Sequence, residues 1–98
     1  MQLTWATDTT DIEQFKLYYA TSSDMTNKIW HQECDGATEQ PAGTGIYTMK
    51  CTNIPIAVFP AYIQMAMKVK NQSDEITSNI QKISSYPIPP NIINITIQ

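Results

Sequence analysis

Arginine is absent from the sequence, and charged residues of either sign are few. The six basic side chains are all lysines, scattered along the chain, and the formal net charge is −3 at pH 7. Arginine is the side chain best suited to gripping phosphates and base edges. Nucleic acids and anionic membranes are also bound through basic stripes, which this sequence lacks. We therefore expect neither as a partner.

Long apolar runs are also missing. No run approaches the length that crosses a bilayer, so we expect no membrane insertion by this segment. The N-terminus lacks the basic-then-apolar pattern of a signal peptide, so a secreted protein would be represented by a mature or excised piece. Hydrophobic residues make up 42% of the 98 positions and are dispersed. That composition fits one domain with a packed core and excludes a disordered chain.

Cysteine is scarce, with Cys34 and Cys51 alone. Two cysteines are too few for a zinc site unless His31 and a carboxylate join them. A disulfide between them would close a loop of roughly 17 residues and contribute on the order of 3 kcal/mol in the chain-entropy model. The alternative is two free, half-buried thiols in a cytosolic protein. We favour the disulfide, because the polar but weakly charged composition is also typical of extracellular β-domains.

Alternation of apolar and polar residues dominates the chain, and helix signatures are missing. Glycine and proline mark the turns, most strongly in the loop 35–45. Regularly spaced short strands predict an all-β fold, an antiparallel two-sheet sandwich with Trp5, Leu17 and Met65 in one core. The predicted strands are 2–5, 15–19, 29–34, 46–52, 61–70, 76–84 and 91–98.

Several segments together match one family pattern. A tryptophan stands in the short strand 3–5 (Leu-Thr-Trp), and an aromatic-x-apolar-x-Tyr strand follows at 15–19 (Phe-Lys-Leu-Tyr-Tyr). Segment 46–56 matches the fifth strand of the pattern and its crossover. Segment 62–84 matches the sixth strand, a turn and the seventh strand. Segment 89–96 matches the proline-rich entry to a first strand and that strand. The chain resembles a fibronectin type III domain that begins at its second strand. The resemblance implies an immunoglobulin-like antiparallel sandwich from an extracellular receptor or cell-adhesion protein.

Tyr62 departs from this family pattern. In the family, a tyrosine at the start of the sixth strand points inward. Here Tyr62 is out of phase with the apolar positions Ile63 and Met65. Either a bulge resets the register or the tyrosine corner is lost.

The order of the segments is also unusual, because a first strand comes last. We assign residues 1–85 to the sandwich, and 86–98 to a proline linker and the first strand of a following or partner domain. A tail that returned over its own domain would run parallel to strand 3–5, whereas the family's first strand is antiparallel. We therefore expect 91–98 to be covered by another domain or molecule. The strand-exchange candidates on its apolar face are Ile93, Ile95 and Ile97.

His31 does not stand in a catalytic pattern. A catalytic histidine needs a nucleophile or a carboxylate beside it. Glu33 shares its strand face, whereas Cys34 falls on the other face. The spacing of His31, Cys34 and Asp35 matches no zinc motif. We expect a surface or edge-strand histidine, and a protein that is not an enzyme, binds no metal and uses no cofactor.

Methionines and carboxylates also have a structural explanation. Met49, Met65 and Met67 share strand faces with isoleucine and valine, which favours core positions over a soft-metal site. No EF-hand loop is present, so we expect the loop carboxylates to be solvated rather than to bind calcium. These carboxylates are Asp8, Asp11, Asp24, Asp35 and Glu39.

Two triplets match the N-glycosylation acceptor pattern, Asn71-Gln72-Ser73 and Asn94-Ile95-Thr96. Such triplets often arise by chance. The first lies in a predicted turn, where a glycan is sterically allowed. The second lies in a predicted strand, where a glycan would need the outward face.

Two functions fit the sequence. The preferred one is a receptor or adhesion module that binds a protein ligand or adjacent domains of the same chain, or that acts as a spacer between them. Tyrosines among polar residues suit protein contacts, and the candidate binding face carries Lys16, Tyr18, Gln64 and Lys68. The alternative is a self-assembling structural subunit that exchanges its terminal strand with a neighbouring molecule.

Overall fold

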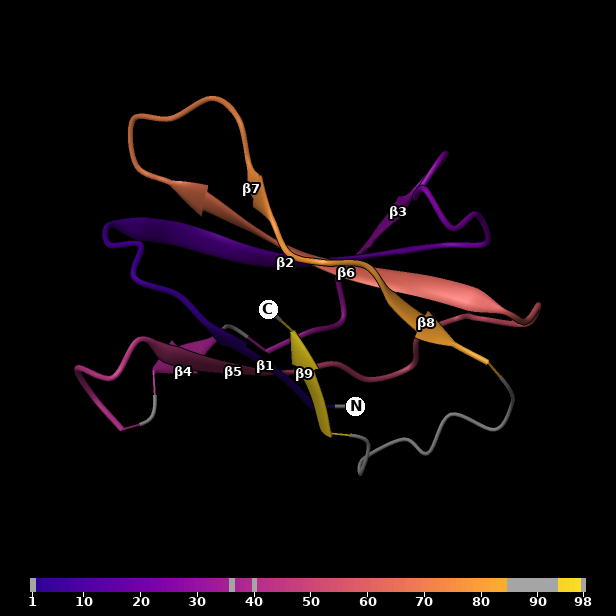
Figure 1. The fold of residues 1–98 in the computed structure, drawn as a ribbon, viewed down its shortest axis with the longest axis horizontal. Coiled ribbons are helices and arrows are strands. Elements are labelled where there is room, and N and C mark those ends of the chain that lie inside the picture. The colour runs from indigo at the N-terminus through magenta and orange to yellow at the C-terminus, as the bar shows by residue number, and fades with distance from the viewer. Residues whose placement is uncertain (1, 36, 40, 85–93, 98) are drawn as a thin grey trace.

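The computed structural model describes residues 2–35, 37–39, 41–84 and 94–97, with the backbone alone for 94–97. The described part of the chain is all-β and contains no helix (Figure 1). Its nine strands are β1 (Gln2–Ala6), β2 (Ile12–Ala20), β3 (Ile29–His31), β4 (Thr38–Glu39), β5 (Ile46–Lys50), β6 (Ala61–Val69), β7 (Ile76–Thr77), β8 (Gln81–Ile83) and β9 (Asn94–Ile97).

The strands form two sheets. One has the order β4-β5-β1-β9, and the other has β3-β2-β6-β7, with β8 also paired to β6. Figure 1 shows the two sheets as separate layers, with β2 and β6 in one layer and β1 and β5 in the other. Every pairing is antiparallel except that of β1 with β9.

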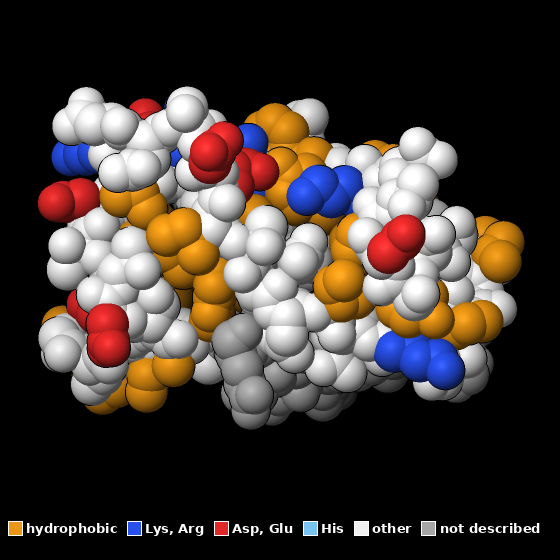
Figure 2. Space-filling view, turned by 45° about the horizontal axis from the view of Figure 1, so that its top comes forward, with side chains coloured by type: hydrophobic (Ala, Val, Ile, Leu, Met, Phe, Trp, Pro, Cys, Tyr) orange, Lys and Arg blue, Asp and Glu red, His pale blue; other side chains and the backbone are white. Residues whose placement is uncertain are grey.

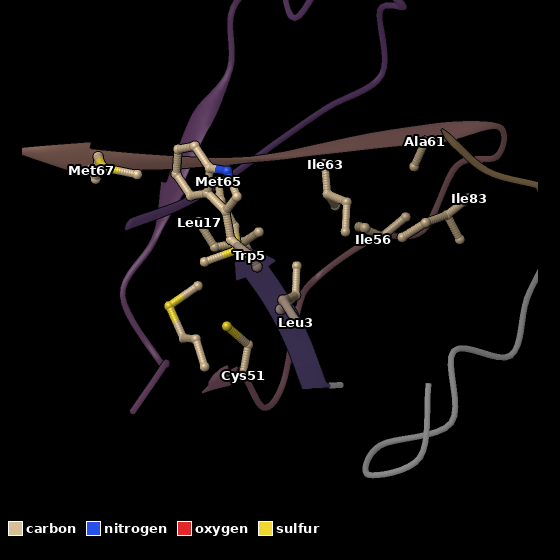
Figure 3. Packing of buried hydrophobic residues seen from close by; sticks show 11 residues of the cluster. Leu3, Trp5, Leu17, Cys51, Ile56, Ala61, Ile63, Met65, Met67 and Ile83 are labelled. Atoms are coloured by element: carbon tan, nitrogen blue, oxygen red, sulfur yellow. The ribbon is translucent and has the colours of Figure 1, made fainter. Parts of the chain in front are cut away.

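One core fills the space between the sheets (Figure 3). Alternation along each strand sends every second side chain inward, as the period-two pattern predicted. The predicted core residues Trp5, Leu17 and Met65 are confirmed, with exposed fractions of 5%, 0% and 0%. Met49 and Met67 are also buried in this cluster, which confirms the structural explanation of the methionines.

A disulfide joins Cys34, after β3, to Cys51, after β5. The S–S distance is 2.09 Å, and the pairing agrees with the sequence prediction. The two residues are partners in an isolated antiparallel β-bridge, so the bond joins two directly paired segments. Two backbone hydrogen bonds flank it, from Asp35 N to Lys50 O at 2.7 Å and from Thr52 N to Glu33 O at 2.9 Å.

The predicted strand 76–84 divides into β7 and β8 at a bulge. Between the pairs Ala66–Thr77 and Ile63–Gln81, two residues of β6 face three residues of the partner segment. Ser78 stabilises this irregularity, because its Oγ accepts a hydrogen bond from Met65 N at 2.9 Å. A bulge of this kind interrupts the sheet edge and discourages pairing with another chain.

The expected loop 35–45 contains a short strand that the sequence analysis did not predict. β4 pairs with β5 at this position, and the Glu39 carboxylate accepts hydrogen bonds from Gly43 N at 3.0 Å and Gly45 N at 2.8 Å. Gly45 has φ +72° and lies against the Thr7 carbonyl, so a Cβ there would collide with backbone. The sequence analysis correctly placed the glycines in a loop. It missed β4 because Glu39, whose carboxylate binds the backbone of the same loop, is not a residue typical of strands.

Tyr62 faces the outside of the sheet, so the tyrosine corner of the family is absent. β6 runs from Ala61 to Val69 without a register shift opposite Tyr62, which pairs with Ala20 and Lys82. The bulge between β7 and β8 lies in the segment that pairs with β6 and not in β6 itself. It therefore does not change the face on which the Tyr62 side chain lies.

The C-terminal strand differs from its expected placement. β9 pairs with β1 of the same chain in parallel, from Gln2 opposite Asn94 to Trp5 opposite Ile97. The parallel direction is the one expected for a tail that lies over its own domain, but we had expected this strand to be covered by another domain or molecule. Of the strand-exchange candidates, Ile93 lies outside the described residues, and only the backbone is described for Ile95 and Ile97.

Candidate functional site

The outer face of the β3-β2-β6-β7 sheet brings the candidate binding residues together. Lys16 and Tyr18 are separated by one residue in β2, so their side chains leave the same side of the sheet. Tyr18 is opposite Gln64, and Lys16 is opposite Ala66. Lys68 lies further along β6 on the same face, by the same alternation. All four predicted residues therefore share one surface.

Glu75, just before β7, binds both β2 side chains from the far edge of the sheet. Its carboxylate forms an ion pair with Lys16 Nζ at 2.9 Å and accepts a hydrogen bond from Tyr18 Oη at 2.7 Å. The strand between them carries only a methyl group at Ala66, which is fully buried beneath this contact. A small residue at that point lets Glu75 reach across β6.

Two lysines lie over aromatic rings on the same face. Lys16 Nζ is 4.6 Å from the centroid of the Trp30 ring, and Lys28 Nζ is 4.4 Å from that of Tyr18. Both distances allow a cation–π attraction. We define the outer-face cluster as Lys16, Tyr18, Lys28, Trp30 and Glu75.

The hydrogen bonds of the outer-face cluster fix its protonation states. Bonding to Glu75 raises the pKa of Lys16, despite the opposing effect of desolvation. Burial, together with the hydrogen bond to Glu75, raises the pKa of the Tyr18 hydroxyl. Burial opposes ionisation of Glu75, but the hydrogen bonds from Lys16 and Tyr18 outweigh it and hold its pKa below the ordinary value of 4.5. At neutral pH, Glu75 is therefore an anion held between a cation and a hydroxyl donor.

Trp30 supplies the largest exposed aromatic surface of the outer-face cluster. It is paired with Tyr18 across β3 and β2, and 39% of the residue is accessible to solvent. Lys28 is also exposed, and within the described part of the chain no carboxylate forms an ion pair with it. An exposed indole and an exposed lysine thus lie beside the Lys16–Glu75 ion pair.

Two of the predicted binding residues contribute less than expected. Gln64 is only 9% exposed, because its amide Nε2 donates to the Ser78 carbonyl at 2.8 Å and the β7–β8 bulge covers it. It is therefore a structural residue of the sheet, and its placement on the accessible binding face was wrong. The Lys68 side chain is 43% exposed and approaches Glu13 at 3.7 Å, a loose ion pair away from the outer-face cluster.

Trp30, Lys28 and Glu75 were missed by the sequence analysis. Glu75 is separated from Tyr18 by 57 positions in the sequence, and no local pattern connects the two. Trp30 lies in a strand that the sequence predicted, but its exposure follows from the position of β3 at the edge of the sheet, which only the strand pairing shows. Figure 2 shows that lysine, carboxylate and apolar side chains are interspersed on the face in view rather than gathered into a patch of one sign.

His31 lies in the edge strand β3, one of the two placements expected from the sequence, but it is not on the surface. It is 6% exposed, because its partner in the sheet is the core residue Leu17 and its side chain therefore points inward. Its Nε2 donates to the Thr52 carbonyl at 2.6 Å, and its ring packs edge-on against Tyr19. Cys34 is consumed by the disulfide, so the structure brings no free thiol to His31.

The carboxylates do not assemble into a recognisable cation site. Among the described residues, no group of three or more histidine, cysteine, aspartate or glutamate side chains could hold a metal ion. Asp24 accepts hydrogen bonds from the hydroxyl and the amide of Thr26, which lower its pKa. Glu39 similarly has a lowered pKa because it binds the Gly43 and Gly45 amides.

The surface depressions formed by described residues include two open ones. One, of about 530 Å³, is lined by residues that include Asp11, Glu13 and Asp35. The other, of about 450 Å³, lies between the β2–β3 loop and the segment that precedes β6, and its lining includes Ile29 and Val58. The second lining contains no charged side chain and combines apolar residues with the polar side chains of Thr21, Ser22, Thr26 and Asn27.

Comparison with protein-family models, with curated proteins and with solved structures found no match to this chain. No helix of the described residues has the length and apolar character needed to span a membrane.

Proposed function

We propose that this chain is a non-catalytic protein-binding module of an extracellular receptor or adhesion protein, of the fibronectin type III kind. It uses no cofactor and recognises a protein partner through the outer-face cluster. The other role that fits such a module is a passive spacer between domains.

The fibronectin type III assignment is supported by the connections between strands. The chain crosses from β1 to β2 in the other sheet, continues to β3, and later returns from β5 beside β1 to β6 beside β2. This crossing pattern is that of immunoglobulin-like sandwiches. The extracellular location is supported by the Cys34–Cys51 bond, because disulfides persist mainly in oxidising compartments.

The exposed Trp30 carries the proposal that the module binds. Tryptophan and tyrosine are enriched among the residues that dominate binding energy at protein interfaces. A passive face needs no exposed indole, and leaving one in water is unfavourable. The Lys16–Glu75 ion pair and the Lys28–Tyr18 contact hold the surroundings of Trp30 in place, which lowers the entropy lost on binding.

A screen against secreted and cell-surface proteins tests this proposal. The full chain, displayed as a multimer, is probed against an ectodomain library, and the Trp30→Ser variant is run in parallel. We expect at least one ligand that the unmodified chain binds and the variant does not. A chain that captures no ligand in this format would be a spacer.

The self-assembly alternative has one observation in its favour. β9 is a four-residue strand whose single strand neighbour in the described sheet is β1, so the same parallel pairing could form with β1 of another molecule. Light scattering of the intact chain against concentration tests it. A monomer at all concentrations, unchanged by deletion of residues 91–98, would exclude strand exchange.

A further inference from the structure

The β6–β7 turn presents one of the two acceptor triplets in an accessible form. Asn71, Gln72 and Ser73 are all exposed, and Gln72 N donates to Val69 O at 3.1 Å to close the turn. Asn71 has φ +64°, a left-handed conformation that asparagine adopts more readily than most residues. Within the described part of the chain, its side-chain amide has no hydrogen-bond partner.

The second triplet has a different setting. Asn94, Ile95 and Thr96 all lie in β9, where they pair with the β1 residues Gln2, Leu3 and Thr4. N-glycans are bulky and are accommodated on surface loops. The two triplets are equivalent as sequence, but only the first lies in a turn.

We infer that Asn71 is an N-glycosylation site of the folded protein, and that Asn94 is not. The inference rests on the proposed extracellular location. In Figure 1 the connection between β6 and β7 projects from one end of the five-stranded sheet, while β3 lies towards the other end. A glycan on Asn71 would therefore extend away from the β3 edge and leave Trp30 accessible to a protein partner.

Mass spectrometry of protein made in the secretory pathway tests the inference. The full chain is expressed in animal cells behind a cleavable secretory leader, and both the secreted and the membrane-enclosed cellular fractions are treated with peptide-N-glycosidase in ¹⁸O water. We expect ¹⁸O-labelled aspartate at position 71 and unmodified asparagine at position 94. An unmodified Asn71 in both fractions would overturn the inference.

Matched variants separate the acceptor chemistry from folding. Ser73→Ala removes the hydroxyl of the triplet and keeps the asparagine in its left-handed turn, so it should abolish the glycan without altering the turn. Ser73→Thr should retain the glycan, and Thr96→Ala should leave the glycan unchanged. A glycan that survives Ser73→Ala would contradict the assignment.

The leader delivers the chain to the secretory pathway whatever its native location. An unglycosylated product therefore counts against the Asn71 site alone. Failure of the ectodomain screen counts against the proposed function alone.

Discussion

Replacing Glu75 by glutamine tests how the outer-face cluster is held together. The substitution removes the charge that pairs with Lys16 Nζ at 2.9 Å and weakens the acceptor of the Tyr18 hydroxyl bond at 2.7 Å. Hydrogen bonds to charged groups contribute about 1.5–3 kcal/mol, and exposed ion pairs about 0–1 kcal/mol. The two side chains of the ion pair are 18% and 22% exposed, so they are neither fully buried nor fully exposed. The contribution of their contact should therefore lie between these two energy ranges. We therefore expect a loss of about 1–2 kcal/mol in the free energy of unfolding at pH 7.

Glu13→Gln is the matched control for this substitution. The Glu13–Lys68 pair is longer, at 3.7 Å, and its side chains are 53% and 43% exposed. Its removal should change the free energy of unfolding by less than about 0.5 kcal/mol. Urea denaturation followed by tryptophan fluorescence measures both variants. The midpoint of Glu75→Gln should fall while the dependence of the unfolding free energy on urea concentration stays the same.

The pH dependence gives the same prediction an independent check. The pKa of Glu75 is lowered on folding, so its stabilisation is complete above the unfolded-state pKa and is lost as the pH falls through the folded-state pKa. The stability gap between the unmodified protein and Glu75→Gln should therefore shrink as the pH falls below 4.5 and through the lowered pKa of Glu75. A gap no larger than that of Glu13→Gln, or one that persists at low pH, would refute the reasoning.

Two further predictions concern the core and the disulfide. Leu17→Ala opens a cavity in the middle of the central β2–β6 pair and should cost about 2–5 kcal/mol in urea denaturation; a loss below that range would mean that the two sheets do not share a packed core there. The Cys34→Ala/Cys51→Ala double variant should lose about 3 kcal/mol, because the bond closes a 17-residue separation. Two thiols titrated in unreduced, denatured protein from an oxidising compartment would show that the bond is absent.

The sequence predicted the sheets well, because side-chain alternation is a local property. Ile63, Met65 and Met67 alternate with polar or small residues, and all three are fully buried. The disulfide was also accessible from sequence, since two cysteines in an otherwise extracellular-type composition have few alternatives.

The errors arose where a residue's environment is set by a distant segment. Gln64 occupies an outward position by alternation, but the bulge at Ser78 covers it and binds its amide. His31 has a polar side chain in an edge strand, yet its position opposite Leu17 turns it into the core. Glu75 reaches Lys16 across Ala66, a contact that depends on the pairing of three strands. None of these environments could be derived from neighbours in the sequence.

Recognition through the outer-face cluster is tested most directly by the affinity of a captured partner for two matched variants. Trp30→Ser removes the exposed indole of the outer-face cluster, whereas Ile46→Ser removes an equally exposed apolar side chain from the other sheet, at 36% against 39%. We predict that Trp30→Ser raises the dissociation constant at least about tenfold, equivalent to about 1.4 kcal/mol. Ile46→Ser should leave it unchanged. Equal affinities for all three proteins, or a loss confined to Ile46→Ser, would contradict recognition through the outer-face cluster.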